Sequence, residues 1–429
     1  MPTLDWIGKE AVINHHNDVE FRLLEHDSKL SHGEPNTGNM LIEGDNLLAL
    51  KALLPYYKEK VDFIYIDPPY NTGNEDWIYN DNLNSPQMKE WLGKVVDRDG
   101  LSRHDKWLCM MYPRLTLLKK LLSNNGIIFI SIDDNEESYL HQVLNEIFGE
   151  RHFIQKIIWK NKYGPGAMTK GFGNVHEYIF CYSKKIIENI QAPLSEESEK
   201  NYKQRDDKFE TRGGYVTQPL ATRSKDPRPN LVYPVYYKDE EIYPDKQWIW
   251  SKNRLYKAIE NDEVIFKKTK DKWSVRFKQY LKNEKGEKRL AKPISILNGP
   301  FNQEGTWEIE NLFGNKDAFN NPKPTALIEY LLSMIVNEKK NKKSLILDSF
   351  SGSGSTGHSV LNINKKYNKK SKFILIEMDP KISKTVTRER LVMGINGYYN
   401  KRKKCEKNGT GGGFDYYRLG ETVFTADGK

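Results

Sequence analysis

The chain has 429 residues and a mass of 50.1 kDa, so its length favours two or three domains over a single core. The formal charge of +9 favours an anionic partner, and the three scattered cysteines exclude a disulfide framework and paired zinc ligands. Neither a secretory signal segment nor an apolar run of about 18 residues is present, so the sequence predicts a cytoplasmic protein without membrane contact.

The first segment with a candidate functional residue is LIEGDNLLALKALL, at residues 41–54. Asp45 is placed to cap a helix, because aspartate is a favoured N-cap residue. Capping uses one carboxylate oxygen, so Asp45 could also contact the adenine of a cofactor. Both interpretations stay open for this residue.

The segment FIYIDPPYNTG, at residues 63–73, ends a predicted strand in an acid, two prolines and a tyrosine. In an open α/β sheet, ligands bind beyond the carboxyl ends of the strands. Pro68 and Pro69 restrict the backbone and remove N–H donors, so the turn presents carbonyl groups and side chains. The Asp67 carboxylate and the Pro68 carbonyl could each accept one N–H of an exocyclic amine, while Tyr70 stacks on the ring that carries it.

Two acceptors on one amine would localise its lone pair and help it to act as a nucleophile. The alternative interpretation is a stiff turn with a capping aspartate. Four specified residues occur by chance in a chain of this length only roughly a few times per thousand, and their position at a strand end further favours the functional interpretation.

Short apolar segments alternate with amphipathic segments along much of the chain. This alternation predicts an α/β domain with a largely parallel sheet that is covered on both faces. Pro113 is expected to bend or split the first of the helices, which Gly126 would close. The expected strands are 61–67, 126–133, 153–159, 177–183, 344–350 and 372–379, and the expected helices are 104–126, 134–149 and 321–336.

This pattern breaks down between about residues 185 and 315, where short aromatic pieces stand among charges and prolines. The region is expected to be an inserted, irregular or β-rich module. Residues 185–300 carry 25 Lys and Arg against 18 Asp and Glu, whereas the rest of the chain carries 42 against 40. The basic residues are therefore candidates for DNA contact, while most of the aromatic residues are expected to form the module's own core.

The segment LDSFSGSGSTGHSV, at residues 347–360, is typical of a strand, a glycine-containing loop and a helix. Gly352, Gly354 and Gly357 would let the backbone and the helix N-terminus approach a ligand closely. No Gly-Lys-Ser/Thr follows, so the loop is not a P-loop. An ordinary tight turn is the alternative interpretation of this loop alone.

The next predicted strand ends at Glu377, about 23 residues after Gly354. An acid at this spacing can bind ribose hydroxyls, as in dinucleotide-binding folds. Taken alone, Glu377 could instead be a strand-end acid that faces solvent. The loop and the acid together favour a nucleoside cofactor.

The order of these segments resembles that of the β-group of S-adenosylmethionine-dependent DNA amino-methyltransferases. In particular, the chain resembles the modification subunits of type III restriction–modification systems, whose ending is similar to GGGFDYYRL at residues 411–419. The other segments that carry the resemblance are DPPYNTG, GIIFISIDDNE, IIWKNK, EYIFCYSK, KPTALIEYLL, LDSFSGSGSTGHSV and FILIEMD.

The resemblance implies a Rossmann-like methyltransferase fold with a largely parallel sheet of the seven-stranded type and a circularly permuted order of motifs. The catalytic domain would consist of residues 1–184 and 316–429, and residues 185–315 would be an inserted target-recognition domain.

The resemblance also implies the cofactor S-adenosyl-L-methionine and a role for each candidate residue. The glycine loop would line the cofactor, Asp348 and Thr356 would hold its methionine end, Glu377 would bind its ribose and Asp45 its adenine. The implied cofactor-binding residues are thus Asp45, Asp348, Phe350, Gly352, Gly354, Thr356 and Glu377, and the residues that hold the target base are Asp67, Pro68, Pro69 and Tyr70.

The expected activity is site-specific methylation of adenine N6 in double-stranded DNA. Aspartate as the first motif residue is typical of adenine-N6 enzymes, and serine is typical of cytosine-N4 enzymes. The alternatives are a cytosine-N4 or RNA amino-methyltransferase, and a DNA-specificity subunit without catalysis. The expected partners are duplex DNA, a second copy of the chain and a restriction (helicase/nuclease) subunit, and no metal ion is expected.

Overall fold

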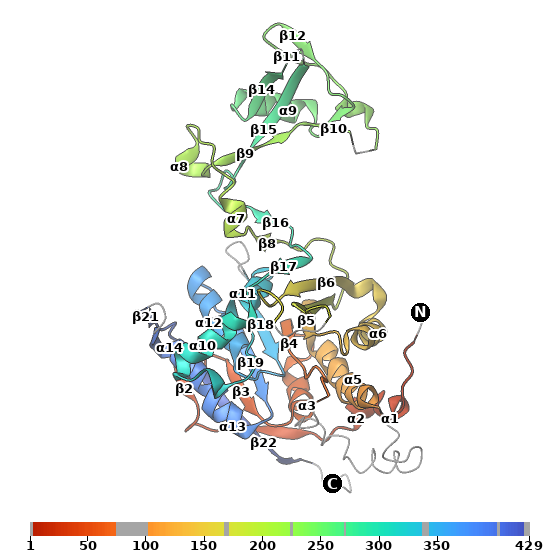
Figure 1. Ribbon diagram of the computed structural model, residues 1–429, viewed down its shortest axis with the longest axis vertical. Coiled ribbons are helices and arrows are strands. Elements are labelled where there is room, and N and C mark those ends of the chain that lie inside the picture. The colour runs from red at the N-terminus through yellow and green to blue at the C-terminus, as the bar shows by residue number, and fades with distance from the viewer. Residues whose placement is uncertain are drawn as a thin grey trace. The chain divides into compact units, whose positions relative to one another are not determined.

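The computed structural model describes residues 3–73, 102–166, 171–223, 226–269, 272–336, 343–400 and 404–423 (Figure 1). The chain forms two compact units, the sheet unit (Met1–Ile190 and Lys292–Lys429) and the inserted unit (Gln191–Ala291). The inserted unit is shorter than the module expected at 185–315. Strand β17 (Ile296–Asn298) and helix α10 (Asn302–Phe313) belong to the sheet unit, because β17 pairs in parallel with strand β6 of the main sheet.

Among the described residues, eleven strands form one sheet in the sheet unit, in the order β1-β22-β3-β19-β18-β4-β5-β7-β6-β17, with β2 paired to β22. The strands from β22 to β5 are parallel, and β7 is antiparallel to both of its neighbours. The expected α/β fold with a largely parallel sheet is confirmed, and β1, β2, β22 and β17 extend a seven-stranded centre. The bounds are β1 Arg22–His26, β2 His32–Gly33, β3 Met40–Glu43, β4 Val61–Ile66, β5 Leu122–Ile132, β6 Phe153–Lys160, β7 His176–Ser183, β18 Leu345–Asp348, β19 Lys372–Glu377 and β22 Gly413–Thr422.

The order of strands in the sheet differs from their order along the chain. Strands β18 and β19 lie between β3 and β4 in the sheet, although both follow the inserted unit in the sequence. The chain continues from β18 to β19 on one side and from β4 to β5 on the other. The boundary between β18 and β4 is therefore a switch point of the topology, and ligands bind beyond the carboxyl ends of the strands at such points.

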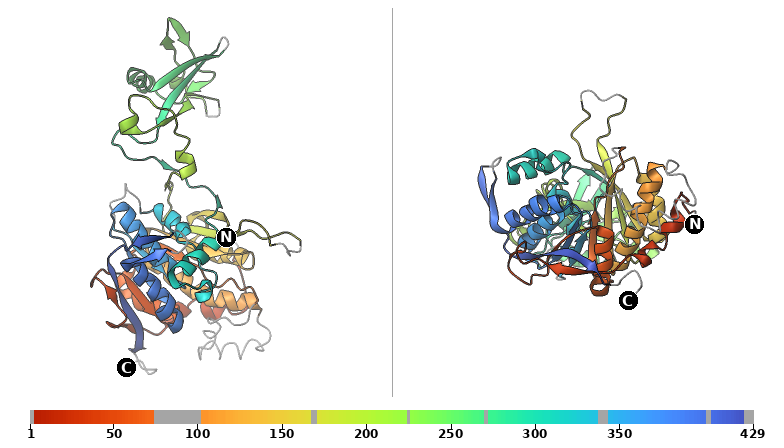
Figure 2. Two further views of the ribbon diagram at one scale, coloured as in Figure 1. Left: turned by 60° about the vertical axis from the view of Figure 1, so that its left-hand side comes forward. Right: turned by 90° about the horizontal axis from the view of Figure 1, so that it is seen from below.

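Helices cover both faces of the sheet (Figure 2). Ile374 and Ile376 of β19 join one buried cluster with residues of α3, α5 and α6, whereas Leu375 lies next to Gly357 of α12. Because side chains of a strand alternate between faces, α12 lies on the face opposite to α3, α5 and α6. The helix bounds are α1 Lys9–Val12, α2 His15–Asp18, α3 Asn46–Tyr57, α5 Arg103–Leu121, α6 Glu137–Phe148, α11 Thr325–Ser333, α12 Ser355–Tyr367, α13 Pro380–Ile382 and α14 Arg388–Asn396.

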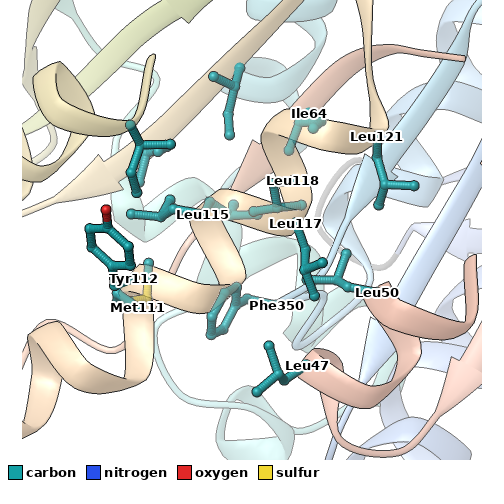
Figure 3. Packing of buried hydrophobic residues seen from close by; sticks show 14 of the residues in the cluster. Leu47, Leu50, Ile64, Met111, Tyr112, Leu115, Leu117, Leu118, Leu121 and Phe350 are labelled. Atoms are coloured by element: carbon teal, nitrogen blue, oxygen red, sulfur yellow. The ribbon is translucent and has the colours of Figure 1, made fainter. Parts of the chain in front are cut away.

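The buried cluster also fixes the start of the glycine loop. Phe350 is 6% exposed and packs with Leu47 and Leu50 of α3 and with Leu117 of α5 (Figure 3). Burial of an apolar side chain of this size stabilises the fold by about 1.5–3 kcal/mol. The loop after β18 is therefore attached to the core at its first turn.

The strands expected from the sequence all form, but one helix differs from its expectation. Helix α5 ends at Leu121, because Leu122 already pairs with Val61 of β4. Gly126 therefore lies within β5 and does not close the helix. Pro113 does not split the helix, since this buried proline lies inside the continuous helix. Packing of α5 against its neighbours outweighs the backbone hydrogen bond that proline removes.

The inserted unit has a small core of its own. Tyr233 and Trp248 are buried in it together with Leu220, Val235 and Leu255. Aromatic residues therefore contribute to this core, as expected, whereas Tyr236 and Tyr243 are exposed. Its strands form the sheet β14-β15-β9 and the pairs β10-β13, β11-β12 and β8-β16. The bounds are β8 Ala192–Pro193, α7 Glu196–Glu199, α8 Phe209–Arg212, β9 Tyr215–Pro219, β10 Ala221–Thr222, β11 Val235–Tyr237, β12 Glu240–Ile242, β13 Gln247–Trp248, α9 Lys252–Glu260, β14 Val264–Thr269, β15 Lys272–Tyr280 and β16 Leu290–Ala291.

Two further strands, β20 (Gly397–Asn400) and β21 (Cys405–Asn408), form a separate antiparallel pair in the sheet unit. Among the described residues, no helix combines the length and the apolar character that crossing a membrane requires.

Candidate active site

The acids predicted from the sequence lie at the carboxyl ends of neighbouring parallel strands. Asp67 directly follows β4, Asp348 is the last residue of β18, and Glu377 is the last residue of β19. These strands are adjacent in the sheet, so the three carboxylates come to the same edge, next to the switch point of the topology.

The turn after β4 is held in place by hydrogen bonds from α5 and by its own side chains. The Trp107 indole N–H donates to the Pro69 carbonyl at 2.7 Å, and the Tyr70 hydroxyl lies 2.8 Å from Asp67 Oδ1. Pro68 is buried, and among the described residues no donor reaches its carbonyl oxygen.

Two residues that the sequence analysis did not single out complete the surroundings of Asp67. Lys323 Nζ donates to Asp67 Oδ2 at 2.8 Å and lies 3.7 Å from Glu177 Oε2. The Tyr70 hydroxyl is 3.0 Å from the same Glu177 oxygen, and Asn161 donates to Glu177 Oε1 at 2.6 Å. Asp67 and Glu177 are therefore two acids that share one lysine and one tyrosine hydroxyl.

The charges in this group shift one another's pKa. Burial raises the pKa of Asp67, and Lys323 acts in the opposite direction; the net shift is upward. Burial alone would lower the pKa of Lys323, but Asp67 and Glu177 outweigh burial, so the pKa of Lys323 is raised. The lysine therefore stays an ammonium ion beside the two acids.

The glycine loop is organised by the last residue of β18. The Phe350 backbone N–H donates to Asp348 Oδ1 at 3.0 Å, and the Thr356 hydroxyl donates to Asp348 Oδ2 at 2.5 Å. Burial raises the pKa of Asp348 to about 7. Because one carboxylate holds both the beginning of the loop and the first turn of α12, Asp348 fixes the loop's shape.

Two of the three predicted glycines adopt left-handed backbone conformations, whereas Gly357 lies inside helix α12. Gly352 has φ +47° and Gly354 has φ +78°, which are conformations that L side chains rarely adopt. A Cβ atom at Gly352 would lie 2.9 Å from Phe319 Cζ, whereas one at Gly354 would lie 3.1 Å from Thr387 Cγ2. The two glycines thus approach different neighbours.

Glu377 joins the loop to the neighbouring strand. It is 6% exposed and accepts hydrogen bonds from the backbone N–H groups of Gly352, at 2.8 Å, and Asp379, at 3.0 Å. Burial raises its pKa to about 7. A solvent-facing strand end, the alternative interpretation of this acid, does not agree with its burial.

Asp45 caps helix α3, as the sequence predicts. Its Oδ1 accepts from the backbone N–H groups of Leu47 and Leu48 at 2.8 and 3.1 Å. Its other oxygen, Oδ2, lies 3.3 Å from Nη2 of the buried Arg114. Both oxygens of Asp45 therefore have protein partners.

Two neighbouring cavities bring the turn after β4 and the glycine loop together. The first, of about 230 Å³, is lined by Asp67, Pro68 and Pro69 from the turn and by Phe350, Gly352 and Glu377 on the other side, with Phe319, Met378 and Ile382. The second, of about 90 Å³, shares Asp67, Phe319, Phe350 and Gly352 with the first and adds Lys323, Asp348 and Thr356, among others. Of the residues predicted from the sequence, Asp45, Tyr70, Gly354 and Gly357 line neither cavity.

Glu177 and Lys323 were not predicted as site residues, although both lie in segments for which the sequence predicts a strand or a helix. Glu177 begins the segment EYIFCYS, and Lys323 is the lysine of NPKP before helix α11. An acid at a strand start and a lysine between two prolines are common features. Only the sheet order brings them to Asp67.

Two other features of the described chain lie apart from the predicted residues. A larger cavity of about 670 Å³ in the sheet unit is lined by Trp307, Glu308, His358 and Tyr398, among others, and by none of the predicted site residues. In the inserted unit, the carboxylates of Asp206, Asp207 and Asp262 lie close together, and Lys278 donates to Asp206 and Asp262 at 2.8 and 2.7 Å. The sequence had not predicted this acidic group.

Comparison with known proteins gives consistent matches. The chain is 33% identical over 424 residues to the type III restriction-modification enzyme EcoPI Mod subunit of Escherichia phage P1, covers 89% of its own length in the match, and spans 64% of that subunit. It is 32% identical over 377 residues to the type II methyltransferase M.KpnI of Klebsiella pneumoniae, with 82% of this chain and 83% of that protein covered. Among solved structures it is similar to the M1.HpyAVI–SAM complex, at 16% identity over 82% of this chain and 98% of that one, with a TM-score of 0.37.

A family model described as DNA methylase, N6_N4_Mtase, matches residues 61–388. The match runs from the beginning of β4 to the beginning of α14 and so includes the turn after β4, the glycine loop and Glu377. Because it spans more than half of the sequence, the chain belongs to this family of DNA methylases.

Proposed function

We propose that this chain transfers a methyl group from S-adenosyl-L-methionine to the N6 amine of an adenine in double-stranded DNA. The observation that carries the proposal is the cavity of about 230 Å³, which the turn Asp67-Pro68-Pro69 lines together with Phe350, Gly352 and Glu377. Methyl transfer requires donor and acceptor to meet in one space at a fixed distance. Membership of the DNA methylase family supports the proposal.

The residues around the two cavities fit the proposed cofactor. S-adenosyl-L-methionine, when bound, supplies an electrophilic methyl group on a sulfonium cation. Asp67, Asp348 and Glu377 place three carboxyl groups around the cavities, which suits a cationic ligand. In this proposal Glu377 binds the ribose hydroxyls, and Asp348 and Thr356 hold the methionine end through the loop that they fix.

The other cofactor contacts of the proposal come from the loop and from helix α3. Phe350, Gly352 and Gly354 line the bound cofactor, and Asp45 lies at its adenine. Since Asp45 already caps α3 and pairs with Arg114, we propose that it acts mainly by fixing the start of this helix.

The turn after β4 would hold the target base. The amine of adenine lies inside the duplex, so the base has to leave the stack before the chemistry. The Asp67 carboxylate and the Pro68 carbonyl then accept the two N–H groups of the amine, and Tyr70 stacks on the ring beside Pro69. Catalysis consists of positioning and of localising the amine lone pair, and transfer to a neutral amine needs no metal ion.

We propose that the inserted unit recognises the DNA sequence. Residues 191–291 carry 23 Lys and Arg against 17 Asp and Glu, and contacts from such residues to phosphates supply most of the affinity for DNA. The match to a Mod subunit supports a role as the modification component of a restriction–modification system. The partners would be a second copy of the chain and a restriction subunit with helicase and nuclease activity, in the cytoplasm.

The test is an assay with the purified chain alone. It is incubated with methyl-labelled S-adenosyl-L-methionine and, in separate reactions, with unmethylated duplex DNA of varied sequence and with RNA, and the labelled nucleosides are identified by mass spectrometry. The expected product is N6-methyldeoxyadenosine, which an Asp67→Ala variant does not form. Label only in N4-methylcytosine or only in RNA would support the alternative chemistry, and DNA binding without any transfer would support a non-catalytic specificity subunit.

A further inference from the structure

Lys323 lies between the two halves of the proposed active site. Its side chain is 8% exposed, and its Nζ lies 2.8 Å from Asp67 Oδ2, 3.7 Å from Glu177 Oε2 and 4.9 Å from the centre of the Tyr70 ring. A buried ammonium ion is stable only where carboxylates or other acceptors surround it. The turn that would hold the target base is thus paired with a fixed cation from the segment before α11.

The backbone of Lys323 is tied to the glycine loop. Its carbonyl oxygen accepts from the Ser355 hydroxyl at 2.7 Å, and Ser355 is the first residue of α12, directly after Gly354. Pro322 and Pro324 flank the lysine and restrict its backbone on both sides. Helix α10 packs tightly on the same segment, because a Cβ atom at Gly305 would lie 2.1 Å from the Pro322 carbonyl oxygen. The backbone that carries the Lys323 side chain is therefore held in a fixed position.

On the basis of the proposed function, we infer that Lys323 is a positioning residue for methyl transfer: it keeps Asp67 in the carboxylate form, and Glu177 holds the lysine in place. A carboxylate can accept a hydrogen bond at either oxygen, whereas a protonated acid turns one oxygen into a donor. A protonated Asp67 would oppose an amine that has to donate to it. The sequence motifs assign no role to Lys323 or to Glu177.

Removal of Lys323 and removal of the Glu177 charge should move the pH dependence of methyl transfer in opposite directions. Without Lys323, the partly buried Asp67 keeps only weak or negatively charged acids as titratable neighbours, so it takes up a proton at a higher pH. Without the charge of Glu177, Asp67 keeps its cation and loses a repelling neighbour, so it takes up a proton at a lower pH. The titratable groups that face Asp67 are Tyr65, Tyr70, Glu177, Lys323 and Asp348, with Glu377 across the larger of the two shared cavities.

The experiment compares kcat/KM for duplex DNA from about pH 6 to about pH 9 at saturating cofactor. Lys323→Met is expected to lower the value near neutral pH by roughly ten- to a hundredfold and to move the acidic limb upward by about one unit or more, because an opposite charge shifts a carboxyl pKa by about one to three units. Lys323→Arg, which keeps the cation, restores the position of the limb. Glu177→Gln moves it downward, and Lys316→Met, at an exposed lysine of the same unit, leaves it unchanged.

Asp348 and Glu377 also titrate near the site, so the effect of Lys323 on Asp67 is measured a second time in an Asp67→Asn background, where Asp67 no longer titrates. In this background Lys323→Met should cost little further activity, because the group that it serves no longer titrates. A loss from Lys323→Met that is independent of pH and undiminished in the Asp67→Asn background would overturn the inference, as would an equal loss of cofactor affinity measured by calorimetry. Should Lys323→Met not fold, an unmoved or raised limb in Glu177→Gln would overturn it. Failure of the proposed function is distinct, since the wild-type chain itself would then not methylate adenine.

Discussion

The backbone N–H of Gly352 donates to Glu377 Oε2 at 2.8 Å. This bond joins the glycine loop after β18 to the last residue of β19, and the Asp379 N–H fixes the other carboxylate oxygen at 3.0 Å. The loop and the acid therefore form one unit, in which the acid is held by backbone groups. A change at Gly352 should disturb both parts.

Gly352→Ala is expected to weaken the binding of S-adenosyl-L-methionine by about tenfold or more. The added Cβ would lie 2.9 Å from Phe319 Cζ, and both residues line the cavities. Gly171→Ala is the matched control, because its φ is also positive but its Cβ would meet no heavy atom within 4 Å, and Gly171 lines neither cavity. Each variant carries a backbone cost of about 1–2 kcal/mol, so calorimetric titration separates the loss at the cavity from this shared cost. Wild-type affinity in Gly352→Ala would contradict the assignment of the loop.

Cofactor affinity is expected to fall as the pH is lowered through about 7. Burial raises the pKa of Glu377 to about 7, so below this pH the group is increasingly protonated and loses both its charge and one acceptor oxygen. The stability of the free protein should change in the opposite sense. A carboxyl whose pKa is raised on folding binds more protons in the folded state, so its contribution to stability falls as the pH rises from about 4.5 towards 7.

Titrations of wild type and Glu377→Gln at several pH values check this prediction. Asp348, whose pKa burial also raises to about 7, remains in the variant, so the pH dependence should become weaker without vanishing. An identical pH dependence in both proteins would show that Glu377 does not bind the cofactor in its ionised form.

Much of the sheet could be predicted from the sequence, because its central strands are short apolar segments with acids or glycines at their ends. Asp67 and Glu377 were recognisable because each follows or ends such a strand, and parallel strands bring their carboxyl ends together. The role of Asp348 came only from the resemblance to DNA amino-methyltransferases. Lys323 was not recognisable, since 256 residues separate it from Asp67. Nothing local to a lysine between two prolines indicates which acid it will meet.

Two further features could not be predicted from the sequence: where the inserted unit ends, and that α5 continues through Pro113. Short strands such as β17 carry too little pattern to be assigned before their partner is known, so the sequence extended the inserted module to residue 315. Pro113 indicates a break by its local chemistry, yet the helix continues because its buried faces pack on both sides. In both cases contacts between residues far apart in the sequence determine the structure.

Exchange of residues 191–291 for the corresponding unit of a related enzyme should change the methylated sequence and leave the chemistry unchanged. These bounds leave β17 and its pairing with β6 intact. Single-molecule sequencing of DNA from cells that express the hybrid reads the base and the site together. A hybrid that still marked the original site would exclude the inserted unit as the source of specificity.

Affinity of the wild-type chain for duplex DNA should fall steeply with salt between about 50 mM and about 200 mM, because phosphate contacts release counterions. Fluorescence anisotropy with a labelled duplex measures the slope. Charge reversal at Lys267, an exposed residue of β14, should reduce the slope by about one if this lysine contacts a phosphate. Binding that does not depend on salt would contradict a basic DNA-contacting surface.

Asp67 and Tyr70 should differ in what their loss removes. Asp67→Ala takes away one of two acceptors for the target amine, and loss of a preorganised polar contact in a transition state costs about 3–4 kcal/mol, which corresponds to a rate lower by about 10² or more. Cofactor binding should largely survive, because Asp348 and Glu377 keep two carboxyl groups at the cavities and the hydrogen bonds of the glycine loop do not involve Asp67. Lys323 keeps Glu177 as a counter-charge in this variant.

Tyr70→Ala and Tyr70→Phe divide the role of the tyrosine into ring and hydroxyl. The ring contributes stacking on the extruded base, worth about 1–3 kcal/mol, and the hydroxyl lies within hydrogen-bond distance of both Asp67 and Glu177. With 2-aminopurine at the target position, whose fluorescence rises on unstacking, Asp67→Ala should still extrude the base and not methylate adenine. Tyr70→Phe should capture the base like wild type with slower transfer, because Asp67 has lost a hydrogen bond, whereas Tyr70→Ala should capture it weakly. Methylation of adenine by Asp67→Ala near the wild-type rate would contradict the central assignment, since no other described acid follows β4 at the cavity.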